Sequence, residues 1–365
     1  MTNQMKYLTL GRSGLKISQL CLGTATFGAG KVGTDEIKSR DIFKRYLELG
    51  GNSFDTSDNY SNGASEKLLG KLLKEYGNRD ELIIGTKYSF NYSKHNPCSS
   101  GNGRKNIYIA IENSLRNLQV DYLDMYWMYL WDTLTPCEEV VATFNDLIRE
   151  GKVRYYGLSN VPAWYATRAY SSAELSRSIG PIALQLEYSL LERSIEREHI
   201  PAAQALNMGI SCWSPLAGGF LSGKYQQLNG EKLSGEGRLA EFQKSNSFAV
   251  PHFSEREWNI VNYLLTVAKE IDKTPAQIAL NWLLAQACVT CVNIGATDLA
   301  HLNESVASLN FDLPDEIKNK LTQVSNIPAC YPYKLFGKQY QQMLNNGFLV
   351  KKSLPVHHTG ILEEV

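Results

Sequence analysis

Phe54-Asp-Thr-Ser-Asp-Asn-Tyr60 and the next apolar run, Glu81-Leu-Ile-Ile-Gly-Thr-Lys87, are the stretches on which the fold assignment depends. Residues 53–55 and 82–87 are short runs rich in apolar and β-branched residues, as buried strands are. The first run ends in Asp55 and leads through a polar loop to Tyr60, and the second ends in Lys87. The sequence therefore predicts an acid, a phenol and an amine at the ends of two consecutive strands.

This trio is suited to acid–base chemistry on an oxygen atom. A tyrosine titrates near ~10 and a lysine near ~10.4 when unperturbed. A buried ammonium at Lys87 is expected to lower the pKa of Tyr60, while Asp55 keeps that ammonium charged and in place. Taken singly, Asp55 could cap a loop, Tyr60 could be a surface aromatic, and Lys87 could extend its head to solvent. Together the three favour a chemical role.

The same alternation of short apolar runs and helical patterns continues outward along the chain. Amphipathic segments are expected at 34–49, which ends before Gly50-Gly51, and at 107–118, 138–148 and 274–284, where Pro275 suits a first helical position. Units of this kind without a break in composition predict one (β/α)₈ TIM barrel, preceded by a β-hairpin near 7–17. The expected strands are 19–23, 53–55, 82–87, 125–129, 153–159, 183–187, 210–214 and 289–294.

Three segments depart from this rhythm. Residues 89–105 and 221–251 form long loops after the third and seventh strands, and the chain continues beyond 327 with several aromatic residues. Loops that follow barrel strands lie on the face where active sites form. We therefore expect a barrel domain over 1–330 and a C-terminal extension over 331–365, with the loops and the extension on the substrate side.

Composition restricts the class of protein. The chain has 365 residues, and its 37 Lys+Arg balance 37 Asp+Glu, so nothing suggests a nucleic acid or another polyanion as partner. No run is long enough to span a bilayer, and no apolar core of a signal peptide follows the start. Seven cysteines without regular spacing fit reduced thiols in the cytoplasm. The oligomeric state stays open.

Four other motifs are weaker. Gly28-Ala-Gly30-Lys-Val-Gly33 matches a dinucleotide-binding fingerprint, with Asp55 downstream, but Thr24-Ala-Thr-Phe27 separates the glycines from the strand. Asp55 to Glu66 imitates a calcium loop, but Tyr60 occupies the position that requires glycine. Cys288-Val-Thr-Cys291 lies in or beside an apolar strand without a second pair, and His357-His358 is near the chain end. We predict no metal site.

An ordered series of motifs from Leu10 to about Leu313 resembles the aldo-keto reductase family. That resemblance implies a barrel that transfers hydride from a nicotinamide to an aldehyde or ketone. The motifs that carry it are Leu10-Gly-Arg-Ser-Gly14, Leu22-Gly-Thr24, Phe54-Asp-Thr-Ser-Asp-Asn-Tyr60, Gly85-Thr-Lys87, Asp121-Tyr-Leu-Asp-Met-Tyr126, Glu150-Gly-Lys-Val-Arg154, Gly157-Leu-Ser-Asn160, Gln185-Leu-Glu-Tyr188 and Trp213-Ser-Pro-Leu216.

The resemblance assigns roles to individual residues. Tyr60 would protonate the carbonyl oxygen, tuned by Lys87 and Asp55. Ser159, Asn160 and Gln185 would hold the nicotinamide carboxamide, although hydrogen bonding to backbone is the simpler alternative. Trp213 would stack on the nicotinamide ring, unless it is a core residue. Further expected cofactor contacts are Gly23, Thr24, Asp55, Ser214, Leu216, Gly218, Lys224, Arg238, Gly295, Thr297, His301, Glu304 and Ser305.

The chain departs from the family pattern in two places. Tyr129 stands where the family usually has histidine; a phenol can donate a hydrogen bond to a carbonyl but does not become a cation near pH 7. The segment from Gly295 to Ser305, expected at the adenosine phosphate, contains no lysine or arginine, and Asp298 is beside it. NADPH remains the family default, and NADH is a second possibility.

The sequence thus predicts a cytoplasmic NAD(P)H-dependent oxidoreductase with Asp55, Tyr60, Lys87 and Tyr129 as catalytic residues. The polar loop at 91–104 favours a hydroxylated or sugar-like carbonyl compound. Two alternatives are a regulatory barrel that senses a nicotinamide cofactor and a dehydrogenase that runs the same chemistry in reverse. Aromatic residues expected to line the substrate pocket are Phe27, Tyr88, Trp127 and Trp131, with Tyr331 or Tyr333 from the extension.

Overall fold

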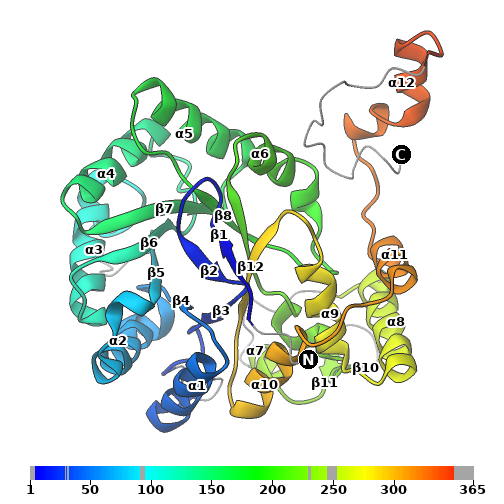
Figure 1. The fold of residues 1–365 in the computed structure, drawn as a ribbon, viewed down its shortest axis with the longest axis horizontal. Coiled ribbons are helices and arrows are strands. Elements are labelled where there is room, and N and C mark those ends of the chain that lie inside the picture. The colour runs from blue at the N-terminus through cyan, green and yellow to red at the C-terminus, as the bar shows by residue number, and fades with distance from the viewer. Residues whose placement is uncertain are drawn as a thin grey trace.

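Eight parallel strands close into a barrel in the computed structural model, which describes residues 5–28, 30, 33–90, 95–228, 232–244 and 253–348 (Figure 1). Their order around the barrel is β12-β3-β4-β5-β6-β7-β8-β9. The predicted (β/α)₈ barrel is therefore confirmed, and the closed sheet excludes the open sheet of a dinucleotide-binding fold. The strands are β3 (Leu20–Gly23), β4 (Ser53–Asp55), β5 (Ile83–Tyr88), β6 (Leu123–Met128), β7 (Val153–Ser159), β8 (Ala183–Glu187), β9 (Gly209–Trp213) and β12 (Val289–Ile294).

Helices surround the barrel and bury one face against it. β5 and β6 are buried at every residue because they face the barrel interior on one side and helices on the other. Thr274 caps α9 with Pro275 as its first residue, as expected. The surrounding helices are α1 (Glu36–Glu48), α2 (Ala64–Tyr76), α3 (Arg104–Leu118), α4 (Cys137–Arg149), α5 (Ala163–Leu175), α6 (His199–Ala205), α9 (Pro275–Leu284) and α10 (Leu299–Ala307).

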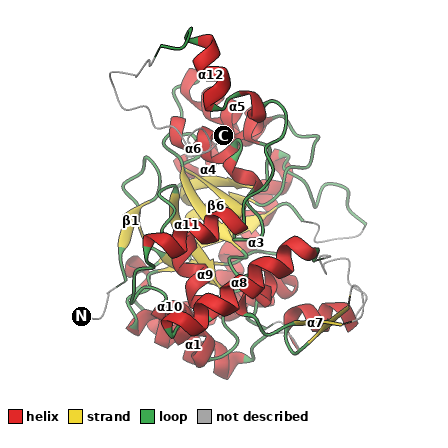
Figure 2. Cartoon of the chain, turned by 90° about the vertical axis from the view of Figure 1, so that its right-hand side faces the viewer, coloured by secondary structure: helices red, strands yellow, loops and turns green. Residues whose placement is uncertain are grey.

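The N-terminal hairpin closes one end of the barrel. β1 (Tyr7–Thr9) pairs antiparallel with β2 (Lys16–Ser18), as the sequence predicts. Leu10 and Ile17 are buried against Trp127 and other residues of the barrel interior. Figure 2 shows β1 at one end of the barrel and α7 (Arg238–Lys244) at the other. The open end, where the strands finish, is therefore the end available for a functional site.

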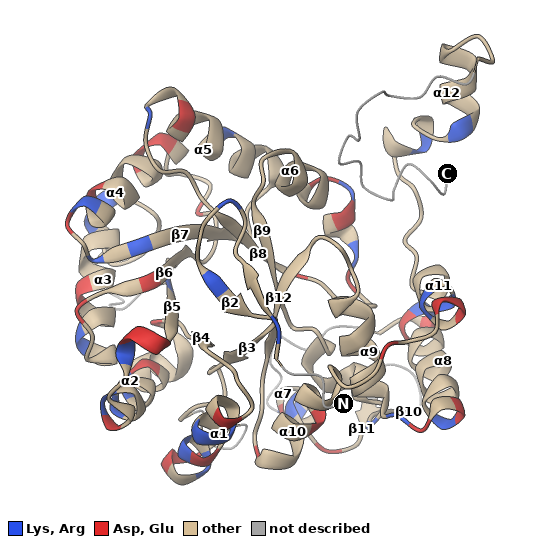
Figure 3. Cartoon of the chain, viewed as in Figure 1, with Lys and Arg blue, Asp and Glu red and all other residues tan. Residues whose placement is uncertain are grey.

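The chain between β9 and β12 adds elements to the barrel. A small hairpin, β10 (Gln226–Leu228) and β11 (Lys232–Ser234), precedes α7. α8 (Glu255–Ile271) then packs against α11 (Asp315–Val324) beside the barrel. In Figure 3 the positions of Lys and Arg and those of Asp and Glu are mixed along the outer helices. Among the described residues, no helix combines the length and apolarity needed to cross a bilayer.

The C-terminal extension follows α11 and passes near the start of α6. Its helix α12 (Lys338–Leu344) projects away from the barrel in Figure 1, and none of its residues is buried. The Tyr333 hydroxyl donates to the carboxylate of Glu198. That the extension covers a substrate stays a prediction. Residues 91–94, 245–252 and 349–365, and with them His357-His358 and parts of the predicted loops, lie outside the described residues.

Candidate active site

The predicted acid, phenol and amine come together at the open end of the barrel. Lys87 is 1% exposed and donates from Nζ to three acceptors. These are Asp55 Oδ2 at 2.5 Å, the backbone carbonyl of Thr56 at 2.7 Å and the Tyr60 hydroxyl at 3.2 Å. Because an ammonium has three N–H groups, all of its donor capacity is used. The buried charge is paired with a carboxylate that is itself 6% exposed.

Backbone hydrogen bonds fix the loop that carries Tyr60. Beyond the end of β4, Thr56 N–H donates to the carbonyl of Gly85 and Asp58 N–H donates to that of Lys87, at 2.9 and 3.1 Å. The loop therefore follows β5 up to the tyrosine. The next two residues, Ser61 and Asn62, have left-handed backbones with φ of 50° and 53°. Such conformations are costly for non-glycine residues and persist where the surroundings enforce them.

The pKa of Tyr60 is raised, which corrects the expectation that Lys87 would lower it. Burial of the phenol is the main cause, and the negative charge of Asp55 raises the pKa further. A side-chain hydrogen bond with Tyr129 and the positive charge of Arg238 act in the opposite direction. Since Lys87 is ion-paired with Asp55 at 2.5 Å, its charge is largely compensated at the phenol. Tyr60 therefore holds its proton at neutral pH, as a proton donor must.

Tyr129 lies beside Tyr60, and Phe90 lies beside Tyr129. The two tyrosine rings are perpendicular with centroids 6.3 Å apart, and Phe90 meets Tyr129 edge to face at 5.0 Å. Burial raises the pKa of Tyr129, and the neighbouring Tyr60 raises it further. Tyr129 is thus a neutral hydroxyl in this site. Sequence reasoning missed Phe90, although its position in a loop just after a barrel strand is a signal.

Amide side chains form the opposite side of the site. Gln185, in the middle of β8, donates from Nε2 to the second carboxylate oxygen of Asp55 at 2.9 Å. Asn160 donates from Nδ2 to the backbone carbonyl of Tyr129 at 2.8 Å and accepts from the indole N–H of Trp213 at 3.1 Å. Ser159 donates to the backbone carbonyl of Gln185. These four side chains are thus in one hydrogen-bonded layer with the catalytic candidates.

The loop after β9 is a tight turn that carries a lysine. Ala217, Gly218 and Gly219 have consecutive left-handed backbones, with φ of 48°, 66° and 93°. Within this turn the N–H groups of Ala217 and Gly219 donate to the carbonyls of Ser214 and Leu216, each at 2.9 Å. A Cβ built on Gly219 would lie 3.2 Å from Nζ of Lys224, so the ammonium is directly over the loop. The predicted residues Ser214 and Leu216 start this loop, and the residues present fit a pyrophosphate.

The predicted adenosine region is partly exposed, with Ser305 buried, and contains a local network. Thr297 and His301 share a hydrogen bond of 2.9 Å, and Asp298 accepts from the backbone N–H of His301 at 2.8 Å as the N-cap of α10. The Asp298 carboxylate also lies 3.0 Å from His301 Nδ1. Gly295 precedes this turn, and Glu304 and Ser305 follow in α10. An acid therefore occupies the position beside the expected phosphate.

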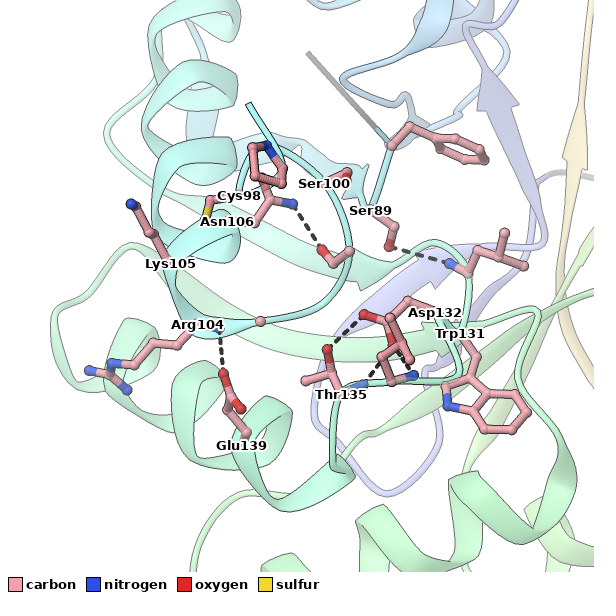
Figure 4. Close-up of a pocket in the computed structure, with 16 residues that line it drawn as sticks. Ser89, Cys98, Ser100, Arg104, Lys105, Asn106, Trp131, Asp132, Thr135 and Glu139 are labelled. Atoms are coloured by element: carbon pink, nitrogen blue, oxygen red, sulfur yellow. Dashed lines mark hydrogen bonds between the residues drawn. The ribbon is translucent and has the colours of Figure 1, made fainter. Parts of the chain in front are cut away.

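Several other expected residues are positioned away from the open site. Thr24 is fully buried and shares a hydrogen bond with Ser65, directly after Gly23 at the end of β3. Three of the four expected pocket aromatics, Phe27, Tyr88 and Trp127, are buried in the core. A Cβ on Gly157 would lie 2.2 Å from the Trp127 ring, which shows how tightly that indole fills the barrel. Trp131, the fourth of them, lines a cavity between the loops that follow β5 and β6 (Figure 4).

Arg238 and Glu187 complete the rim. Arg238 starts α7, is exposed, and acts on Tyr60 through its charge. Glu187 ends β8 opposite Trp213 and is half-buried. Burial raises the pKa of Glu187 to about 7, with the charge of Glu192 as a second cause. Sequence reasoning missed this carboxyl, although it is two residues after Gln185 and shares its side of the strand.

Comparison with known proteins agrees with this geometry. A model described as the aldo/keto reductase family matches residues 19–326. The chain is 33% identical to an uncharacterized oxidoreductase, YrpG, of Bacillus subtilis, over 88% of this chain and 96% of that protein. It is 34% identical to a putative voltage-gated potassium channel subunit beta of Schizosaccharomyces pombe, over 87% of this chain and 92% of that protein. It is 30% identical to a norsolorinic acid reductase of Aspergillus flavus, over 88% of this chain and 81% of that protein.

The match covers all eight barrel strands and every residue of the Asp55, Tyr60 and Lys87 cluster. The chain therefore belongs to the aldo/keto reductase family, a family of oxidoreductases.

Proposed function

We propose that this protein reduces an aldehyde or ketone to an alcohol with NADPH or NADH, and that Tyr60 donates the proton. The observation that supports this most is the buried Lys87, which joins Asp55 and the Tyr60 hydroxyl beside Gln185 and Trp213. A bound reduced nicotinamide dinucleotide would supply the hydride. Asn160, Gln185 and Trp213 would hold its nicotinamide end, and the Gly218 loop with Lys224 its pyrophosphate.

The protein side chains divide the remaining work. Tyr60 keeps its proton because burial raises its pKa, and it releases that proton only as negative charge develops on the carbonyl oxygen. Lys87 donates to the Tyr60 hydroxyl at 3.2 Å, and this hydrogen bond would stabilise the phenolate left behind. Asp55 holds Lys87 in position, and Gln185 holds Asp55. The ion pair thus assists proton transfer as the neutral phenol of Tyr60 becomes a negatively charged phenolate.

Tyr129 would give this site a different pH response from one with histidine. Its hydroxyl lies beside Tyr60 and can donate to the substrate carbonyl, which orients the reacting group. Because a phenol stays neutral near pH 7, it adds no second proton and no positive charge. We therefore expect reduction to depend weakly on pH between about 6 and 8.

A regulatory role is a second candidate. The similarity to proteins named as potassium channel beta subunits, from Schizosaccharomyces pombe and Oryza sativa, is what favours it. Such a protein would bind a nicotinamide cofactor without appreciable turnover. Sustained turnover separates the two proposals.

The test begins with identification of the dinucleotide that co-purifies with the chain. Turnover is then measured on aldehydes, diketones and keto sugars for the wild type and Tyr60→Phe, with cofactor affinity measured in parallel. Multiple turnovers that require the Tyr60 hydroxyl support the reductase. Tight cofactor binding without turnover on the whole panel would contradict it and favour the regulatory protein.

A further inference from the structure

Glu187 is a titratable group at the open end of the barrel that the proposed mechanism does not use. It is the last residue of β8, and its side chain is half-buried. Within the described part of the chain, its carboxylate has no hydrogen bond and no ion pair. A partly desolvated carboxylate without a protein partner is costly in the folded protein, unless a ligand supplies the missing partner.

The side chain of Glu187 faces the interior of the barrel. Gln185, two residues earlier in β8, donates to Asp55 at 2.9 Å and therefore points inward. Side chains two residues apart share one side of a strand, so Glu187 points the same way, ~7 Å nearer the open end. Glu187 thus follows directly after the amide that is expected to bind the nicotinamide carboxamide.

Trp213 borders Glu187 on the neighbouring strand. The two residues are register partners at the ends of β9 and β8. The indole N–H of Trp213 donates to Asn160 Oδ1 at 3.1 Å, and Asn160 directly follows β7. Because β8 lies between β7 and β9, the indole crosses the end of β8, where Glu187 is located. An aromatic ring and a carboxylate are therefore adjacent at the expected position of the nicotinamide.

The charges around Glu187 do not compensate its carboxylate. Burial raises the pKa of Glu187 to about 7, with the like charge of Glu192 in the following loop as a second cause. Charged groups on the surrounding elements are Asp55 and Lys87, paired at 2.5 Å, Arg193 and Glu196, paired at 2.7 Å, and Arg238, whose charge acts on Tyr60. Glu187 is therefore partly ionised at neutral pH, and a positive charge placed beside it would favour its ionised form.

An oxidised nicotinamide ring would supply such a positive charge. The ring is cationic when it is oxidised and neutral when it is reduced, whereas its carboxamide is the same in both states. Aromatic faces and carboxylates both attract cations. Asn160 and Gln185 would therefore bind both oxidation states equally through the carboxamide, and a carboxylate beside the ring would distinguish them by charge.

We infer that Glu187 makes the site selective for the oxidation state of the cofactor, because its carboxylate beside Trp213 attracts the oxidised nicotinamide ring and not the reduced ring. This inference rests on the proposed function only in that a nicotinamide dinucleotide binds, and it does not depend on the carbonyl substrate. The selectivity is present above the pKa of Glu187 and is lost as pH falls through it. By linkage, binding of the oxidised ring holds Glu187 ionised and releases a proton near pH 7, whereas binding of the reduced ring does not.

The test measures dinucleotide binding to the full chain without a carbonyl substrate. Calorimetry gives the dissociation constants of NAD⁺, NADH, NADP⁺ and NADPH at pH 6 and pH 8. Repeating it at pH 7 in two buffers of different ionisation enthalpy gives the number of protons released. The variant is Glu187→Gln, which has nearly the same shape and no charge. The matched control is Glu270→Gln, because Glu270 is an exposed carboxylate on α8 beside the barrel.

We expect the oxidised ring to lower the pKa of Glu187 from about 7 to about 6, the smallest shift typical of a neighbouring opposite charge. Glu187→Gln should then weaken binding of NAD⁺ and NADP⁺ by about ninefold at pH 8 and only about twofold at pH 6. Binding of NADH and NADPH should not change. The wild type should release about 0.4 proton at pH 7 with the oxidised forms, beyond any release that the reduced forms also cause. Glu270→Gln should behave as wild type.

The inference is overturned if Glu187→Gln weakens oxidised and reduced forms equally, which would indicate a structural role, or if it changes neither. Should this variant not fold, the wild type decides alone: equal proton release with NAD⁺ and NADH contradicts the inference. The two proposals fail separately. Selective binding of the oxidised forms without turnover on any carbonyl compound contradicts the reductase and retains the role of Glu187. Turnover without this selectivity contradicts the role of Glu187 alone, and absence of binding by all four dinucleotides overturns both.

Discussion

Tyr60→Phe should eliminate reduction while leaving the fold intact. The variant removes one hydroxyl, which accepts from Lys87 at 3.2 Å. Lys87 keeps its bonds to Asp55 at 2.5 Å and to the Thr56 carbonyl at 2.7 Å, so its buried charge stays paired. Loss of one hydrogen bond costs about 1 kcal/mol of the free energy of unfolding. Loss of the proton donor should lower turnover by about 10²–10⁴-fold.

The assay follows oxidation of the reduced nicotinamide by absorbance during reduction of an aldehyde, alongside urea denaturation and cofactor titration. The control is Tyr7→Phe, which deletes a hydroxyl that donates to the Gly50 carbonyl at the closed end of the barrel. Cofactor affinity should be equal in wild type and both variants. Turnover of Tyr60→Phe within about tenfold of wild type, a barrier change below ~1.4 kcal/mol, would refute the assignment of Tyr60 as proton donor.

Four further changes test other parts of the site. Lys87→Met leaves the buried Asp55 carboxylate without its ammonium, so the free energy of unfolding in urea should fall by about 3–5 kcal/mol; a loss below about 1 kcal/mol would show that the pair contributes little. Glu187 has a pKa raised to about 7, so its stabilising contribution is present below its ordinary value of 4.5 and is lost as pH rises through about 7. The free energy of unfolding should fall by roughly 1–2 kcal/mol between pH 4 and pH 8, after allowance for the partial exposure of Glu187. Glu187→Gln should remove this dependence of the free energy of unfolding on pH. Thr297→Lys should shift cofactor affinity toward NADPH by about tenfold, since it adds a cation where the expected phosphate site has none; an unchanged NADPH to NADH ratio would place the phosphate elsewhere. Tyr129→His introduces a group that titrates near ~6.5, so the pH profile of kcat should gain a step there, and an unaltered profile would remove Tyr129 from contact with the carbonyl.

The architecture was predictable because parallel barrel strands are buried on both faces and therefore appear as short apolar runs. β4, β7, β8 and β12 begin and end where the sequence pattern predicts, and the remaining barrel strands differ by one or two residues. Helix signals were equally local: Thr274 and Pro275 start α9, and Gly50 follows the end of α1 with a φ of 86°. Such signals depend on neighbouring residues only, so one sequence suffices to find them.

The side-chain environment was less predictable because it depends on distant parts of the chain. The pKa of Tyr60 rises rather than falls, since folding buries the phenol and pairs Lys87 with Asp55. Phe27 and Trp127 resemble pocket residues in sequence, but barrel closure places both in the core. An aromatic residue near a strand end has the same local pattern whether it faces a helix, the barrel interior or the open end.

The sequence by itself thus determined the alternation of strands and helices, and with it the end of the barrel at which Asp55, Tyr60 and Lys87 gather. Only the tertiary structure decided which partner each group has: Gln185 on Asp55, Asn160 between Tyr129 and Trp213, and Phe90 between the site and its neighbouring cavity. The physical reason is the distance along the chain over which each interaction acts. Backbone conformation follows mainly from local chain chemistry, whereas burial, ion pairing and cavity shape arise from residues that closure of the barrel brings together from far along the chain.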